Sequence, residues 1–193
     1  KKIIGLGVLP DDKDDDYEVI DCSGCIIVPN IVDSLVYQSY DSLADLSRIA
    51  VNAGVTGIGL FPEEPFLMDS PEHVTLILKK AHEEARIHIH PIGSLTKSMI
   101  KDGQEKQGMA ELDLMKEAGA TAFIDTHSIE STVQMRNILT YATLTGKTMM
   151  IRSLDNELSN GGLMNEGYQA TILGLKPSPS IAEELRIARD IQL

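Results

Sequence analysis

The sequence predicts an α/β protein with a parallel sheet, in the form of an incomplete TIM barrel. From Ile31 onward, short apolar runs alternate with longer amphipathic stretches, and parallel neighbouring strands need crossover connections of this kind. No glycine-rich phosphate loop follows the first predicted strand, at residues 31–36, as an open doubly wound sheet would require. A barrel is therefore the better of the two parallel architectures.

Each predicted element begins or ends at a residue with a physical reason to be there. Gly54 and Gly119 end two helices, Ser70 and Pro71 begin another, and Pro62 closes a strand. The predicted strands cover residues 31–36, 55–61, 87–92, 121–124 and 148–151. The predicted helices cover residues 42–53, 70–85, 109–118, 132–144 and 180–193.

These elements make only about five βα units, whereas a TIM barrel needs eight in roughly 250 residues. Either the remaining segments are absent from this chain, or a partner covers the open edge strand, which otherwise favours aggregation. We therefore expect at least one strand edge with unpaired backbone groups, or further polypeptide paired with it. Residues 31–193 form this part of the barrel, and residues 1–30 carry two or three short strands around an acidic loop at 11–16.

The composition excludes several classes of function. An apolar content of 42% is typical of a globular protein, and 17 basic against 29 acidic residues leave a net charge of −12. This charge disfavours binding to nucleic acids and to anionic membrane surfaces, because both kinds of binding need a basic patch on the protein. The sequence has neither an apolar run of about 18 residues nor the pattern of a signal peptide. We expect a cytoplasmic protein that binds no nucleic acid and no membrane.

Cys22 and Cys25 form a C-x-x-C motif, which is compatible with a redox pair or with half of a zinc site. No second Cys or His pair follows at a spacing typical of zinc sites. The motif also lies between two short apolar runs, at residues 19–21 and 26–28, with Ser23 and Gly24 between them. This pattern favours a strand, a tight turn and a second strand.

Several motifs resemble a known family, in order and across nearly the whole chain. Residues 19–33, VIDCSGCIIVPNIVD, are similar to the segment by which amidohydrolases leave a small β-sandwich and enter the first barrel strand. The motifs PIGSLTK at 91–97, KEAGATAF at 116–123, GLMNEG at 162–167 and AEELRIARD at 182–190 resemble dihydroorotases of the bacterial multifunctional-complex type. The chain resembles roughly the first half of such a protein.

The resemblance implies a domain organisation and a chemistry. Residues 1–30 would be part of the β-sandwich domain, and residues 31–193 the first five or so βα units of the amidohydrolase barrel. The reaction of the family is the cyclisation of N-carbamoyl-aspartate to dihydroorotate in pyrimidine biosynthesis, with zinc as the cofactor. Its metal ligands must be imidazoles and carboxylates at the carboxyl ends of the strands.

The residues expected at the metal ligand positions are absent. The two histidines of the family's D-x-H-x-H motif fall on Leu35 and Tyr37. The bridging carboxylate falls on Thr126, although Asp125 before it is retained. The histidine after the fifth strand falls on Arg152, a permanent cation that repels a metal ion. The resemblance therefore implies no metal ligand and no metal cofactor in this chain.

The substrate positions are replaced as well. The arginine that grips the substrate carboxylate in the family falls on Ser39, and the asparagine of a Met-Pro-Asn motif falls on Glu63, which would repel an anionic substrate. Because the residues at the metal ligand positions and at the substrate positions are replaced together, we predict that the catalytic site is lost and assign no catalytic residue. The motif His88-Ile89-His90 places two imidazoles on one face of a strand; a structural role is the favoured interpretation, and a ligand pair is the alternative.

Three functions stay open. The leading hypothesis is an inactive dihydroorotase homologue with a scaffold or assembly role, as a homo-oligomer, with aspartate carbamoyltransferase as the candidate partner. The second is an active metal-dependent cyclic amidohydrolase that uses ligands not visible in this chain, and the third is a small-molecule sensor that keeps the pocket without the metal. We expect Leu35, Tyr37, Thr126 and Arg152 to lie together at one end of the barrel, because strand ends converge there.

Overall fold

The computed structural model describes residues 7, 18–37, 42–101 and 104–193. Its centre is a five-stranded sheet in the order β1-β2-β3-β6-β7, in which every neighbouring pair is parallel. The strands are β1 Val32–Val36, β2 Gly57–Leu60, β3 His88–Ser94, β6 Ala122–Ile124 and β7 Thr148–Met150. The predicted α/β class and the five predicted strands are confirmed.

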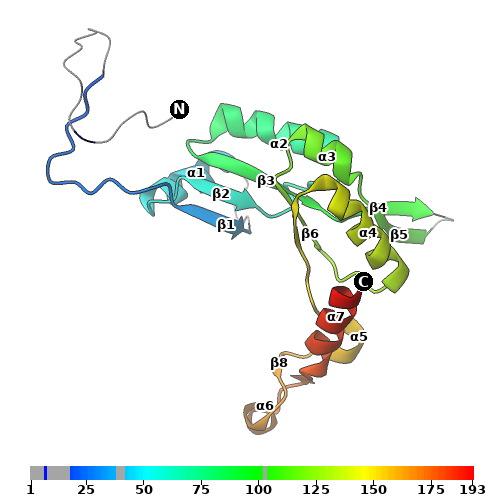
Figure 1. The fold of residues 1–193 in the computed structure, drawn as a ribbon. Coiled ribbons are helices and arrows are strands. Elements are labelled where there is room, and N and C mark those ends of the chain that lie inside the picture. Colours follow the sequence, from blue (N-terminus) through cyan, green and yellow to red (C-terminus); the bar gives the residue numbers. More distant parts are fainter. Residues whose placement is uncertain (1–6, 8–17, 38–41, 102–103) are drawn as a thin grey trace.

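Four helices connect these strands: α1 Leu43–Asn52, α2 Pro71–Glu84, α3 Leu112–Ala118 and α4 Thr132–Thr145. Figure 1 shows α2 and α3 side by side along the sheet. The predicted helix signals are confirmed, because the Ser42 and Ser70 hydroxyls accept hydrogen bonds from the first turns of α1 and α2. Gly119, with φ +115°, ends α3 in the left-handed conformation.

The core lies between the sheet and these helices and is closely packed. At Gly93 of β3, an added Cβ would lie 2.8 Å from the Phe123 ring and would overlap the Met115 side chain. Only glycine lets α3 approach the sheet this closely. The largest fully buried side chains are Phe123, Leu43, Ile58, Leu60, Met68, Ile92, Leu95, Met115, Ile129, Met135, Ile138 and Val74.

An antiparallel hairpin, which the sequence analysis did not predict, follows β3 directly. It consists of β4 Thr96–Lys101 and β5 Gln104–Met109, in which Thr96 pairs with Met109 and Lys101 with Gln104. The predicted start of the third helix at Met109 is therefore wrong, because Met109 ends β5 and α3 begins at Leu112. The two strand sequences are mostly polar and lack apolar alternation, so the hairpin depends on backbone pairing that hydrophobic periodicity does not reveal.

The predicted strands at 19–21 and 26–28 are wrong. Residues 18–30 contain no strand, and their apolar side chains, such as Val19 and Ile26, are exposed. The two runs do not pair across the turn, and no other described strand lies beside them. The tight turn itself is confirmed, since the Cys25 N–H donates to the Cys22 carbonyl at 2.9 Å and Gly24 has φ +80°. Both cysteines are free, and residues 8–17, which carry the predicted acidic loop, lie outside the described residues.

After β7 the chain makes an excursion away from the sheet (Figure 1). It contains α5 Asn156–Ser159, β8 Met164–Asn165, α6 Tyr168–Leu173 and β9 Pro177–Ser178, with β8 and β9 paired in parallel. The predicted last helix, α7 Ile181–Gln192, then returns toward the end of β6. Arg189 of α7 donates hydrogen bonds to the carbonyls of Glu130 and Ile129, at 3.0 and 3.2 Å.

The sheet is an open half-barrel with β1 and β7 at its edges. In the part of the chain that the structure describes, no further strand pairs with the outer side of β7. The expected open edge and the incomplete TIM barrel are therefore confirmed. Among the same residues, no helix is both long and apolar enough to cross a membrane.

Candidate functional site

A pocket of about 480 Å³ lies at the carboxyl ends of the strands. Leu35 and Tyr37 come from the end of β1, Thr126 from the residues after β6, and Arg152 from those after β7. The expectation that these four residues lie together is confirmed. The other lining residues are Phe61, Ile124, Asp125, Met150 and Ile151. Active sites of TIM barrels lie at this end of the strands.

Much of the pocket wall is apolar. The Tyr37 and Phe61 rings are stacked, with centroids 4.2 Å apart and an interplanar angle of 29°. Leu35 and Met150 pack against a buried cluster that includes Phe61 and Ile124. Where two imidazoles would have to hold a metal ion, the pocket therefore presents an aromatic ring and a leucine side chain.

Asp125 is the one carboxyl group among the lining residues, and it is only 2% exposed. Its Oδ2 accepts a hydrogen bond from the Ile129 N–H at 3.3 Å, while its Oδ1 is buried and has no partner among the described residues. Burial raises the pKa of Asp125 from 3.8 to about 6. The Ile129 N–H, the Arg186 guanidinium and the His127 N–H oppose this rise, and Asp190 adds to it.

Thr126 belongs to a network of hydroxyl groups. Its Oγ1 lies 3.1 Å from the Oγ of Ser94, and the Ser94 hydroxyl donates to the Thr96 carbonyl at 2.7 Å. Thr126 is therefore the donor in its bond to Ser94. Ser94 is 1% exposed, and the sequence analysis did not single it out, because a lone serine at the end of a strand carries no signal.

Arg152 brings a permanent positive charge to the pocket. Its side chain forms no ion pair with any carboxylate that the structure describes. Of the two substrate positions, Ser39 lies outside the described residues. Glu63 is exposed in the loop after β2 and does not line the pocket, so the structure does not bring it to the other residues.

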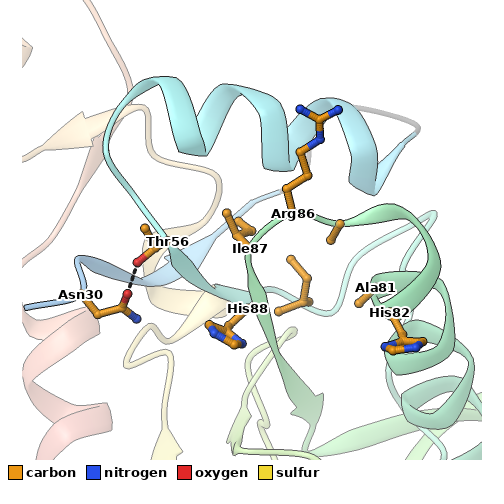
Figure 2. A pocket seen from close by; sticks show the side chains of 9 residues that line it. Asn30, Thr56, Ala81, His82, Arg86, Ile87 and His88 are labelled. Carbon is orange, nitrogen blue, oxygen red and sulfur yellow. Dashed lines mark hydrogen bonds between the residues drawn. The ribbon is translucent and has the colours of Figure 1, made fainter. Parts of the chain in front are cut away.

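Among residues 7, 18–37, 42–101 and 104–193, no group of three or more His, Cys, Asp and Glu side chains is arranged to hold a metal ion. The ring centroids of His88 and His90 lie 6.5 Å apart on β3. His88 lines a different pocket of about 420 Å³, together with His82, Arg86, Asn30 and Thr56 among others. Figure 2 shows this pocket, with the Arg86 guanidinium extending away from the two imidazoles.

The pocket in Figure 2 lies at the amino ends of the strands, because Asn30, Thr56 and His88 precede or begin β1, β2 and β3. The active sites of TIM barrels lie at the opposite, carboxyl ends of the strands. The Asn30 amide oxygen accepts a hydrogen bond from the Thr56 hydroxyl, which joins the chain before β1 to the start of β2. This arrangement supports the structural interpretation of the His88-x-His90 motif.

A parallel half-barrel with its pocket at the carboxyl ends of the strands is part of a TIM barrel. In agreement, the fold is similar to that of the L-hydantoinase (dihydropyrimidinase) from Arthrobacter aurescens, with a TM-score of 0.66. The two sequences are 17% identical, and the similarity covers 93% of this chain and 42% of the hydantoinase. At this identity the likeness concerns the fold alone.

The relatives in sequence are dihydroorotases. The chain is 34% identical over 183 residues to the dihydroorotase of Pelotomaculum thermopropionicum, which covers 91% of this chain and 42% of that protein. It is 33% identical to the enzyme of Ruminiclostridium cellulolyticum over the same shares, and 31% identical over 195 residues to that of Syntrophus aciditrophicus. No family model matches the chain. The resemblance to dihydroorotases is confirmed, and the chain spans about two fifths of the length of these relatives.

Proposed function

We propose that the protein is a dihydroorotase homologue of pyrimidine biosynthesis that has lost its metal site and acts by assembly. One observation carries this proposal: the pocket at the carboxyl ends of the strands is lined by Leu35, Tyr37, Thr126 and Arg152. Dihydroorotase chemistry needs a metal-bound hydroxide. None of these four side chains is a usual metal ligand, and the Arg152 guanidinium repels a cation.

An assembly role would use the apolar surface of the excursion after β7. The excursion after β7 exposes Leu163, Tyr168, Ile172 and Leu173 by 60% or more, and apolar surface of this kind favours protein contacts. We infer a cytoplasmic homo-oligomer, with aspartate carbamoyltransferase as the candidate partner.

Metal analysis together with a cyclisation assay tests the loss of the site. The full-length protein should contain far less than one metal ion per chain and should not convert N-carbamoyl-aspartate to dihydroorotate. The dihydroorotase of Pelotomaculum thermopropionicum, prepared in parallel, serves as the positive control. Turnover comparable to this control by the unaltered protein would contradict the proposal.

Co-purification with the carbamoyltransferase of the same organism tests the assembly role. Deletion of the protein should reduce the activity or the stability of the carbamoyltransferase. Substitutions confined to the pocket, such as Thr126→Ala, should leave this effect unchanged. A carbamoyltransferase that is equally active and stable without the protein would contradict the assembly role, and the loss of the metal site would still stand.

A second candidate is an active amidohydrolase in which Asp125 is one metal ligand and the other ligands lie outside the described residues. One observation favours it: Asp125 lines the pocket with a buried Oδ1 that has no described partner, and such a carboxyl oxygen is a possible metal ligand. The metal content of the assembled complex distinguishes the two candidates, because the active enzyme would bind stoichiometric zinc.

A further inference from the structure

Arg152 is an exposed cation at the pocket at the carboxyl ends of the strands, and it forms no ion pair with a described carboxylate. The other charged lining residue, Asp125, already has a cation near it, because the Arg186 guanidinium lowers the pKa of this carboxyl. Arg152 has no such counterpart among the described carboxylates. A guanidinium offers a fork of N–H donors whose geometry matches a carboxylate, so the pocket can supply a cation to an anionic ligand.

The rest of the wall sets the shape of that ligand. The stacked Tyr37 and Phe61 rings form one apolar surface, and Leu35, Ile124 and Met150 provide more. A volume of about 480 Å³ falls within the range of roughly 300 to 1,000 Å³ that small-molecule sites occupy. Pockets of mainly apolar lining with a few polar groups bind molecules that have an apolar body and a polar end.

The negative charge of Asp125 adds a restriction. Its carboxyl group lines the same pocket as Arg152, and a dianion would bring two negative charges toward it. A ligand with one negative charge, held at Arg152, avoids this repulsion. The Thr126 hydroxyl donates to Ser94, and the His127 Nδ1 lies 3.2 Å from the same oxygen, so one lone pair of Thr126 is left to accept from a polar group of the ligand.

We propose that this pocket binds a small organic monocarboxylate, with the carboxylate on Arg152 and an apolar or planar body against Tyr37 and Phe61. The inference rests on the proposed absence of a metal ion from the pocket. It assigns to Arg152, which stands at a family ligand position, the recognition of an anion by direct hydrogen bonds. The protein would then bind a metabolite that it does not convert.

The test is a titration of the full-length protein, treated with EDTA, with benzoate as the probe. Binding should be saturable with a Kd in the millimolar range, as expected for a ligand of this size. Benzamide has the same shape without the charge and should bind at least about 10-fold more weakly, because a charge-assisted hydrogen bond is lost. Inorganic phosphate should also bind more weakly than benzoate.

Two variants locate the binding. Arg152→Gln should weaken benzoate binding at least about 10-fold, whereas Arg136→Gln, on the exposed face of α4, should bind as the unaltered protein does. Tyr37→Ala should weaken benzoate and benzamide alike, because it removes the aromatic wall and leaves the charge. A circular dichroism spectrum of each variant checks its folding.

Several results would overturn the inference: no saturation by benzoate, equal binding of benzamide or phosphate, or unchanged binding by Arg152→Gln. Loss of benzoate binding on EDTA treatment would also overturn it, since the anion would then bind through a metal. Stoichiometric zinc in the untreated protein, with benzoate binding that survives EDTA, would instead contradict the proposed function and leave the anion site in place.

Discussion

Asp125→Asn should stabilise the protein, and the gain should grow as the pH rises. The folded state holds the carboxyl at a pKa of about 6, raised by burial from 3.8, and each tenfold change in an equilibrium constant corresponds to about 1.4 kcal/mol. The ionised carboxylate therefore costs the folded state about 3 kcal/mol once the pH lies well above 6. Asparagine keeps an oxygen that can accept the Ile129 N–H and carries no charge.

The sign follows from which state loses its proton first. Below the unfolded pKa of 3.8, both states are protonated and the charge costs nothing. Between 3.8 and about 6, the unfolded chain ionises before the folded one, so stability falls as the pH rises. The difference between Asp125→Asn and the unaltered protein should increase from about 1.5 kcal/mol near pH 5 to about 3 kcal/mol near pH 8.

Urea denaturation followed by far-UV circular dichroism, at several pH values across this window, measures the difference. Asp113→Asn is the matched control, because Asp113 is 70% exposed on α3 and should show no such trend. If Asp125→Asn is less stable than the unaltered protein near pH 8, the charge of Asp125 is stabilising, and Arg186 outweighs burial. A difference that does not vary with pH would refute the reasoning as well.

Three further predictions concern packing, capping and the lost metal site. Gly93→Ala should lower the free energy of unfolding by about 1 to 3 kcal/mol, because the new methyl group meets the Phe123 ring. A melting temperature equal to that of the unaltered protein would contradict the packing argument. Ser70→Ala should lower the free energy of unfolding by about 1 kcal/mol, because it removes the acceptor for the His73 N–H at the start of α2. Ser180→Ala, where no capping bond exists, is the control in the same denaturation experiment. The last variant rebuilds the metal site with four substitutions: Leu35→His, Tyr37→His, Thr126→Asp and Arg152→His. It should bind zinc weakly at most by calorimetry and should not cyclise N-carbamoyl-aspartate, because the partners that orient such ligands are not in place. Tight zinc binding by this variant would show that the supporting residues are retained.

The sheet and its pocket were accessible from sequence because apolar periodicity and end signals reflect local physics. Ser42, Ser70 and Gly119 act within one helical turn, and each confirms the boundary it predicted. The convergence of Leu35, Thr126 and Arg152 needed only the rule that parallel strands end on one side.

The features that the sequence did not reveal depend on contacts between distant residues. The β4–β5 hairpin pairs mostly polar strands by their backbones, which leaves no periodic pattern. The exposed runs at 19–21 and 26–28 have the composition of strands, but strands form only where a neighbour pairs with them. The raised pKa of Asp125 depends on its burial and on Arg186 of α7, two properties that exist only in the folded chain.

Arg186 shows that the type of a residue alone does not predict its burial. Arginines are rarely buried, yet the Arg186 side chain is 2% exposed and forms an ion pair with Glu130 at 3.3 Å. Its helix was predicted from its amphipathic pattern, which assigns a charged residue to the solvent side. The position of α7 against the loop between β6 and α4 reverses this assignment.

The closed base of the excursion after β7 has a consequence for how this protein can change over evolution. The Asp155 N–H donates to the Ala182 carbonyl at 2.9 Å, so the two ends of residues 156–181 are tied to each other. Arg189 reaches the carbonyls of Ile129 and Glu130 and ties this base to the barrel. Lengthening a loop whose ends are already held costs only about 0.6 kcal/mol for each doubling of its length. Insertions and rewritten sequences in this segment are therefore tolerated by the sheet, and new binding specificities can arise there without loss of the fold.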